Sequence, residues 1–210
     1  MSDAKIKVIT EVCRSSYMFV NKLEEDDNGT KKCKTAILIP KKNKRTIKAI
    51  QAAIEAASQK KFHKKAVKGS SKWSYPLRDG DAELESGELE VENPHDYEGM
   101  YFLSATAYKI PQLVNNENER VEDFEEREEM CVSGNWFKFS ITFKGFEVDG
   151  NKGVRALLNN IMYWKEGDRL DGGKKAEEDF DGQGVDDDEQ EEEEEEKPSR
   201  KSRRKGRRNR

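Results

Sequence analysis

Long apolar runs are missing from this sequence, and so are the residues from which metal sites and disulfide frameworks are built. No segment approaches the roughly 18 apolar residues of a membrane-spanning helix, and the first residues lack the apolar region of a secretory signal. Three cysteines, odd in number and far apart, indicate a reducing compartment without a disulfide framework. The two histidines, His63 and His95, lie near no cysteine pair, so we expect no zinc site.

Catalytic constellations are also missing. Asp79 and Asp81 form a carboxylate pair around Gly80 that could hold a divalent metal, but a turn is the commoner interpretation of these residues. The segment "GNKG" at 150–153 lacks the spacing of a phosphate-binding loop. No nucleophile has an adjacent base. We therefore expect no enzyme, no catalytic residue, no metal and no cofactor, with a metal-dependent nuclease as the weakest alternative.

Charge is abundant and strongly segregated. Charged residues make up 39% of the chain, yet the net charge is only -4. Segment 177–196 holds 14 acidic and no basic residues, whereas 197–210 holds nine basic and no acidic residues. Because Phe180 and Val185 are the only apolar residues in 177–210, this tail cannot bury enough surface to offset the cost of ordering it. The sequence predicts a folded domain over 1–176 and a disordered tail over 177–210.

Segregation continues inside 1–176. Between Lys31 and Lys72 there are 14 lysines or arginines and one acidic residue, Glu55, whereas acidic residues dominate between Asp79 and Glu129. A basic segment of this size favours a polyanion such as nucleic acid. The alternative is a solvated lysine-rich helix that binds no ligand.

Hydrophobic periodicity predicts a mainly β domain with one main helix. Asn43 as N-cap candidate and apolar residues at helical spacing predict a helix over 43–61. The predicted buried face consists of Ile47, Ile50, Ala53, Ile54 and Ala57. A basic loop is expected at 60–73, and a loop or short exposed helix at 115–130. Strands are predicted over 15–23, 33–40, 99–114 and 154–164. With the strand described next, these elements suit a small antiparallel barrel.

The most informative stretch is "SGNWFKFSITFKGFEVDGNKGV" at 133–154. Its alternate residues Phe137, Phe139, Ile141 and Phe143 have the period of two of a half-buried strand. The opposite face mixes aromatic rings with lysines, as single-stranded nucleic acid requires, because rings stack on unpaired bases while cations bind phosphates. The alternative is that Trp136 and Phe146 pack on the barrel end or helix. The candidate contacts are Lys41, Lys42, Lys64, Lys65, Lys72, Trp73, Tyr75, Trp136, Lys138, Lys144 and Phe146.

An ordered series of segments resembles one known family. The series runs "ILIPKKNKRTIKAIQAAIEAA", "PLRDGD", "YFLSATA…PQLV", "SGNWFKFSITFKGFEVDGNKGVRALLNNI" and "DRLDGGKKAEEDFD". Over roughly 5–182 the chain is similar to phage-encoded single-stranded-DNA-binding proteins, long catalogued as a family of unknown function. The sequence departs from the family plan in its terminal "KPSRKSRRKGRRNR" and in a strand richer in Phe and Lys.

The resemblance implies an OB-fold barrel that binds single-stranded DNA during phage replication or recombination, without enzymatic activity. It implies an acidic tail that competes with DNA for the groove and recruits replisome proteins. The expected location is the cytoplasm of the infected host cell, or the nucleus if that host is eukaryotic, with no membrane partner. A homodimer is compatible with the sequence. Two alternatives remain, an acidic-tailed adaptor or chaperone for basic proteins and an RNA-binding protein.

The terminal basic run has two interpretations. It is either a second, unstructured grip on phosphates or an address, since "RRKGRR" would also serve as a nuclear signal.

Overall fold

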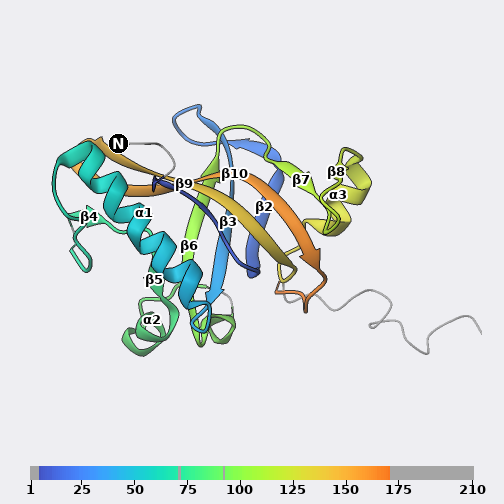
Figure 1. Ribbon diagram of the computed structural model, residues 1–210, viewed down its shortest axis with the longest axis horizontal. Coiled ribbons are helices and arrows are strands. Elements are labelled where there is room, and N and C mark those ends of the chain that lie inside the picture. Colours follow the sequence, from blue (N-terminus) through green and yellow to red (C-terminus); the bar gives the residue numbers. More distant parts are fainter. Residues whose placement is uncertain (1–4, 71, 92, 171–210) are drawn as a thin grey trace, which may run out of the picture. The chain divides into compact units, whose positions relative to one another are not determined.

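Five long strands form the body of the protein. A computed structural model of the chain describes residues 5–70, 72–91 and 93–170 (Figure 1). The five strands are β2 (Cys13–Glu25), β3 (Lys31–Pro40), β6 (Met100–Ala107), β9 (Trp136–Val148) and β10 (Asn151–Lys165). The sequence-based predictions for the tail, 177–210, lie outside the described residues.

These five strands close into a barrel. β2 pairs with β3, β3 with β6, β6 with β10, β10 with β9, and β9 again with β2. The expected purely antiparallel arrangement needs correction, because β6 and β10 run parallel. A closed ring with an odd number of strands cannot alternate direction all the way round, so one neighbouring pair must be parallel. This ring order is that of the OB-fold, a five-stranded Greek-key barrel, which confirms the expected fold class.

Shorter strands extend the sheet beyond the ring. β1 (Lys7–Ile9) pairs with β9, while β7 (Gln112–Val114) pairs with β10 and continues to β8 (Arg120–Val121). β4 (Trp73–Ser74) runs beside β10 and β5 (Arg78–Asp79) beside β6. The single strand predicted over 99–114 is therefore two strands. The break contains Pro111, which has no N–H to donate to a ladder.

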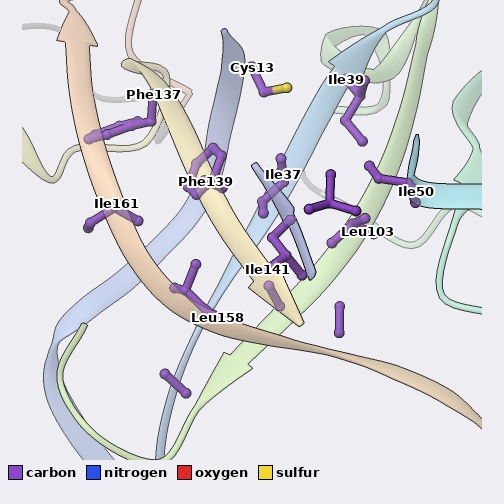
Figure 2. Close-up of a cluster of buried hydrophobic side chains, with 14 of the residues drawn as sticks. Cys13, Ile37, Ile39, Ile50, Leu103, Phe137, Phe139, Ile141, Leu158 and Ile161 are labelled. Carbon is purple, nitrogen blue, oxygen red and sulfur yellow. The ribbon is translucent and has the colours of Figure 1, made fainter. Parts of the chain in front are cut away.

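The barrel interior holds the core, and β9 supplies its largest side chains. Phe137, Phe139, Ile141 and Phe143 are each 0% exposed, which confirms the period-two prediction. Figure 2 shows three of them, Phe137, Phe139 and Ile141, within the buried cluster. Ile37 from β3, Leu103 from β6 and Ile161 from β10 pack in the same cluster. Each fully buried side chain of this size stabilises the fold by about 1.5–3 kcal/mol.

Helix α1 (Lys44–Phe62) packs against β9 and β1 with its apolar face. The predicted face is confirmed, since Ile47, Ile50, Ala53, Ile54 and Ala57 are all buried. Asn43 is the N-cap residue, but its side chain does not cap the helix; its amide instead donates to the Val12 carbonyl at 3.0 Å. A Cβ on Gly145 would lie 2.5 Å from the Lys61 Cβ, so only glycine allows the helix this close to β9.

Three short helices complete the described chain. The sequence predicted a turn at Asp79–Asp81. In the structure Asp79 immediately precedes α2 (Gly80–Ser86). The 3₁₀ helix η2 (Pro94–Tyr97) places Tyr97 over Leu38 and Phe102, which form a second apolar cluster on the outside of β3 and β6.

The acidic segment 115–130 contains helix α3 (Phe124–Met130), capped by the Asp123 carboxylate, which accepts from the Glu126 N–H at 2.9 Å. The helix is not wholly exposed, because Arg127 is buried and donates to the Asn21 side chain and the Pro111 carbonyl. No helix within the described ranges is long and apolar enough to cross a membrane.

Candidate nucleic-acid interface

Small side chains, those of Ala36, Ser104 and Thr106, lie on the outer face of β3 and β6. Across the antiparallel β3–β6 pair, Lys34 lies opposite Thr106 and Ala36 opposite Ser104. On the other side of β6, Leu157 of β10 is the partner of Thr106. Alanine, serine and threonine rise little above the backbone, so this part of the barrel wall is a hollow rather than a ridge.

A groove of about 510 Å³ occupies this hollow. Arg155 on β10 and Lys34 on β3 contribute positive charge. Tyr75 and Arg78 belong to the segment that contains β4 and β5. Tyr17 lines the groove from β2, and Tyr97 and Phe102 of the second apolar cluster complete it. Among the described residues that line the groove none is acidic. The groove therefore combines cations with aromatic rings, the pairing that single-stranded nucleic acid requires.

Tyr17 enters the groove because β2 is irregular at this point. Its φ of 47° lies in the left-handed region that few non-glycine residues adopt. The ladder between β2 and β3 shifts register between Ser16 and Phe19, as at a β-bulge, which redirects side chains. Tyr17 and Phe19 have ring centroids 6.2 Å apart, and Phe19 is 49% exposed. Strained backbone of this kind is concentrated at binding sites.

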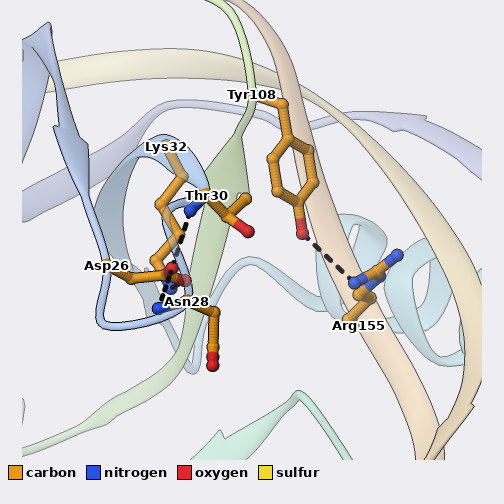
Figure 3. Close-up of polar contacts among 6 residues, drawn as sticks. All are labelled: Asp26, Asn28, Thr30, Lys32, Tyr108 and Arg155. Carbon is orange, nitrogen blue, oxygen red and sulfur yellow. Dashed lines mark hydrogen bonds and ion pairs between the residues drawn. The ribbon is translucent and has the colours of Figure 1, made fainter.

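Arg155 is held by aromatic residues rather than by a carboxylate. Its Nη1 donates to the Tyr108 hydroxyl at 3.2 Å (Figure 3), and its guanidinium carbon lies 5.9 Å from the Tyr108 ring and 6.0 Å from the Phe146 ring. Within the described ranges no acidic side chain forms an ion pair with Arg155 or Lys34. Both cations are free to bind phosphate. Arg78, in contrast, is paired with Glu83 and lies 4.8 Å from the Phe102 ring.

The hairpin that joins β2 and β3 carries a neutralised lysine. The Asp26 carboxylate accepts from the Asn28 and Thr30 N–H groups at 3.1 and 2.9 Å, and from Lys32 Nζ at 2.7 Å (Figure 3). The hydrogen bond from Lys32, followed by that from Thr30, lowers the pKa of Asp26, and the same contact raises the pKa of Lys32. Asp26 therefore remains ionised and closes the turn.

Three of the residues proposed from the sequence lie at or beside this groove. Tyr75 lines it, and burial followed by the nearby Glu55 carboxylate raises the pKa of its hydroxyl. Lys144 is the cross-strand partner of Arg155, and the Phe146 ring lies next to the same guanidinium. The groove and the neighbouring wall of β9 therefore share a continuous surface around Arg155.

Other proposed residues lie elsewhere. Lys41 is bound by two carboxylates, with Nζ 2.5 Å from Asp79 Oδ1 and 2.7 Å from Asp81 Oδ2. Burial alone would lower the pKa of Lys41, but the two aspartates outweigh it and raise the pKa. Trp73 is only 8% exposed and packs edge-on against Phe62 at 4.8 Å, so its ring offers little surface to a base. Lys42 is exposed in the turn before α1, and three further exposed lysines follow the helix: Lys64, Lys65 and Lys72.

Trp136 and Lys138 lie towards the far end of β9 from Arg155. Lys138 Nζ lies 3.9 Å from the centre of the Trp164 ring, and Lys165 Nζ 5.7 Å from that of Trp136. Trp136 is half-buried, because the backbone at Gly167 packs on it: a Cβ there would lie 2.8 Å from the indole Nε1. These four residues are not part of the groove.

Sequence reasoning missed five residues that build or adjoin the groove: Tyr17, Lys34, Arg78, Tyr108 and Arg155. The outward orientation of Arg155 could have been predicted, because it is the one charged residue in the apolar run "VRALL" and a charged side chain points out of a barrel. The position of Tyr17 could not be predicted from the local sequence, because a bulge inside a strand depends on the pairing with the partner strand. Within the described residues, no group of three or more His, Cys, Asp or Glu side chains is arranged to hold a metal ion.

An OB-fold barrel with a basic, aromatic groove defines a class of oligonucleotide-binding modules. A family model described as "Enterobacter phage Enc34, ssDNA-binding protein" matches residues 6–194, which is most of the chain. The protein belongs to this family. Protein p50 of Acyrthosiphon pisum secondary endosymbiont phage 1 is 27% identical over 160 residues, which cover 73% of this chain and 80% of that protein.

Solved structures of phage proteins share the fold. The single-stranded-DNA-binding protein of bacteriophage Enc34 in complex with ssDNA has a TM-score of 0.65 and 22% identity, covering 79% of this chain and 89% of that one. The same phage protein in another structure is 24% identical with a TM-score of 0.63, covering 83% and 89% of the two chains. Bacteriophage T7 gp2.5, a single-stranded DNA binding protein, reaches a TM-score of 0.54 at 13% identity over 87% and 96%.

Proposed function

We propose that the protein binds and protects single-stranded DNA during phage DNA replication or recombination, without catalysing a reaction. The observation that carries the proposal is the groove on β3, β6 and β10, where Arg155 and Lys34 have no carboxylate partner among the described residues. OB-folds bind oligonucleotides on this face, formed by the second and third barrel strands. Membership of a family described by ssDNA binding adds support.

Unpaired bases are the preferred ligand because stacking needs an accessible ring face. Tyr17 and Tyr75 are half-buried at the groove, and Phe19 is exposed beside Tyr17. Each stacked base contributes about 1–3 kcal/mol and any base can stack, so the preference for sequence is weak. A duplex hides its base faces and therefore binds only through phosphates.

Titration of labelled oligo-dT, duplex DNA and oligo-rU, each with and without magnesium, tests this proposal. We expect single strands to bind far more tightly than duplex, with log affinity falling against log salt by about 0.7 per phosphate neutralised. Equal affinity for single strand and duplex near 0.15 M salt would contradict it. Tighter binding of oligo-rU would indicate RNA as the ligand, and loss of DNA during incubation with magnesium would indicate a nuclease.

For the tail we propose a regulatory role. The 14 acidic residues of 177–196 would compete with DNA for the groove and recruit replisome proteins, while the nine basic residues of 197–210 would grip phosphates. Support comes from the charges alone, because opposite charges attract over roughly a Debye length of 8–10 Å. This role belongs in the cytoplasm of an infected cell.

Two truncations separate these roles. Removal of 197–210 deletes nine positive charges and leaves the acidic run free to compete, so affinity for oligo-dT should fall. Removal of 177–210 deletes both runs, so affinity at low salt should return to the full-length value or exceed it. If the two truncations weaken binding equally, the acidic run does not compete for the groove.

A further inference from the structure

The wall formed by β9 and β10 is almost free of acidic residues. β10 contains none over its 15 residues, and β9 contains only Glu147, near the hairpin that joins the two strands. This is unusual in a chain that holds 43 acidic residues. A strip of this kind offers a polyanion a path without repulsion.

Cations and aromatic rings lie at both ends of this strip. Arg155 stands at the groove, with the Phe146 ring beside it. At the other end Trp164 is 38% exposed, and Lys138 Nζ lies 3.9 Å from the centre of its ring. The cation holds the indole in place while part of the ring surface stays accessible. Trp164 and Lys138 therefore repeat the combination found in the groove.

A second hollow lies beside β10 between the positions of Arg155 and Trp164. A depression of about 540 Å³ is lined by Leu157–Asn160 of β10 and by the segment from Thr106 to Ile110. Thr106 also lines the groove, so the two depressions adjoin. Tyr108 and Ile110 are 44% and 48% exposed at its edge. Asn159 donates its side-chain amide to the Thr142 hydroxyl at 2.9 Å, so the middle of the strip is polar and uncharged.

We propose that a single strand longer than the groove continues along this strip and stacks on Trp164, with Lys138 binding a phosphate. The inference rests on the proposed function and adds a second contact site to it. The nine residue-to-residue steps from Arg155 to Trp164 span about 30 Å at about 3.3 Å per step. This second site is therefore beyond the reach of a very short oligonucleotide bound in the groove. Affinity should rise with length until both sites are filled.

Oligo-dT of two lengths tests this inference, at about 5 and about 16 nucleotides, the range of site sizes of OB-folds. Trp164→Ala should weaken binding of the long oligonucleotide about 5- to 150-fold, the loss expected for one stacked base, and leave the short one unchanged. Trp164→Phe keeps a ring and should restore most of the affinity. Phe124→Ala is the matched control, because Phe124 is a 47% exposed ring on α3 and should affect neither length.

Lys138→Gln provides a second readout, the salt slope, which counts phosphate contacts rather than stacked bases. It should lower the salt slope for the long oligonucleotide by about 0.7, one phosphate contact, and leave the slope for the short one unchanged. Unchanged long-strand affinity in folded Trp164→Ala, or equal losses at both lengths, would overturn the second site while leaving the groove intact. If wild-type protein binds neither length, the proposed function itself fails and the inference fails with it.

Discussion

Lys41 and Arg155 are both cations beside an aromatic ring, yet their surroundings differ. Lys41 Nζ lies 5.2 Å from the centre of the Tyr101 ring and is bound by Asp79 and Asp81 at 2.5 and 2.7 Å. Arg155 is held by the Tyr108 hydroxyl and by rings, with no carboxylate partner among the described residues. Lys41 ties the turn before α1 to the start of α2, whereas Arg155 keeps its charge available. The number of cations in a segment therefore does not measure the positive charge offered to a ligand.

The largest effect in this comparison is expected from Arg155→Ala. Loss of one charge-assisted hydrogen bond to phosphate costs about 1.5–3 kcal/mol, so affinity for oligo-dT should fall roughly 10- to 150-fold. The melting temperature should hardly change, because the side chain is exposed. Fluorescence anisotropy and thermal melts check both values. Arg155→Lys keeps the charge and serves as control. If it binds as poorly as Arg155→Ala, the bidentate hydrogen-bond geometry of the guanidinium contributes more to affinity than its charge.

Lys41→Met should show the reverse pattern. It leaves Asp79 and Asp81 without their shared cation, so the free energy of unfolding should fall by about 1–2 kcal/mol. Affinity for oligo-dT should stay within about twofold of the wild-type value, because Asp79 and Asp81 already neutralise the charge of this lysine. Chemical denaturation and the same DNA titration measure the two quantities. Lys42→Met removes the same charge from an exposed neighbour and should change stability by less than about 0.5 kcal/mol. A large loss of DNA affinity in Lys41→Met alone would place Lys41 in the interface.

A smaller effect is expected from acid. Burial would raise the pKa of Asp79, but Lys41 outweighs it and the pKa is lowered; the hydrogen bond from Lys41 likewise lowers the pKa of Asp81. Because the folded pKa values lie below the unfolded value of about 3.9, the stabilisation is complete above that pH and is lost as pH falls through the folded values. The difference in stability between wild type and Lys41→Met should therefore be constant near pH 6 and shrink below about pH 4. Denaturation series at several pH values measure it, and a difference that grows in acid would contradict the ion-pair account.

Much of the fold followed from local patterns. The alternation in 137–143 predicted the inner face of β9, and the spacing of Ile47, Ile50 and Ile54 predicted the buried face of α1. In both segments the apolar residues recur with the period of the element, so the sequence of the segment alone shows which of its faces packs on the core. The hairpins at 24–32 and 149–153 are local features as well, because each contains a turn-forming pair, Asn28-Gly29 or Asp149-Gly150.

The candidate site was only partly visible in the sequence. Tyr75, Lys144 and Phe146 were proposed and lie at or beside the groove, but Lys41 was proposed without its two aspartates. Asp79 and Asp81 are about forty positions away in the chain, and only the pairing of β5 with β6 brings them to Lys41. Trp73 was chosen because it stands next to lysines, yet the parallel pairing of β4 with β10 buries it.

The sequence by itself determined which residues face the core, where the long strands and the helix lie, and that positive and negative charge are separated along the chain. The tertiary structure alone decided which cations remain unpaired and which aromatic rings stay exposed. The reason is that burial pattern depends on neighbours within a few residues, whereas charge neutralisation depends on partners from other strands. Arg155 meets Tyr108 and Phe146 only because β10 runs parallel to β6 and antiparallel to β9, the arrangement that closes the barrel.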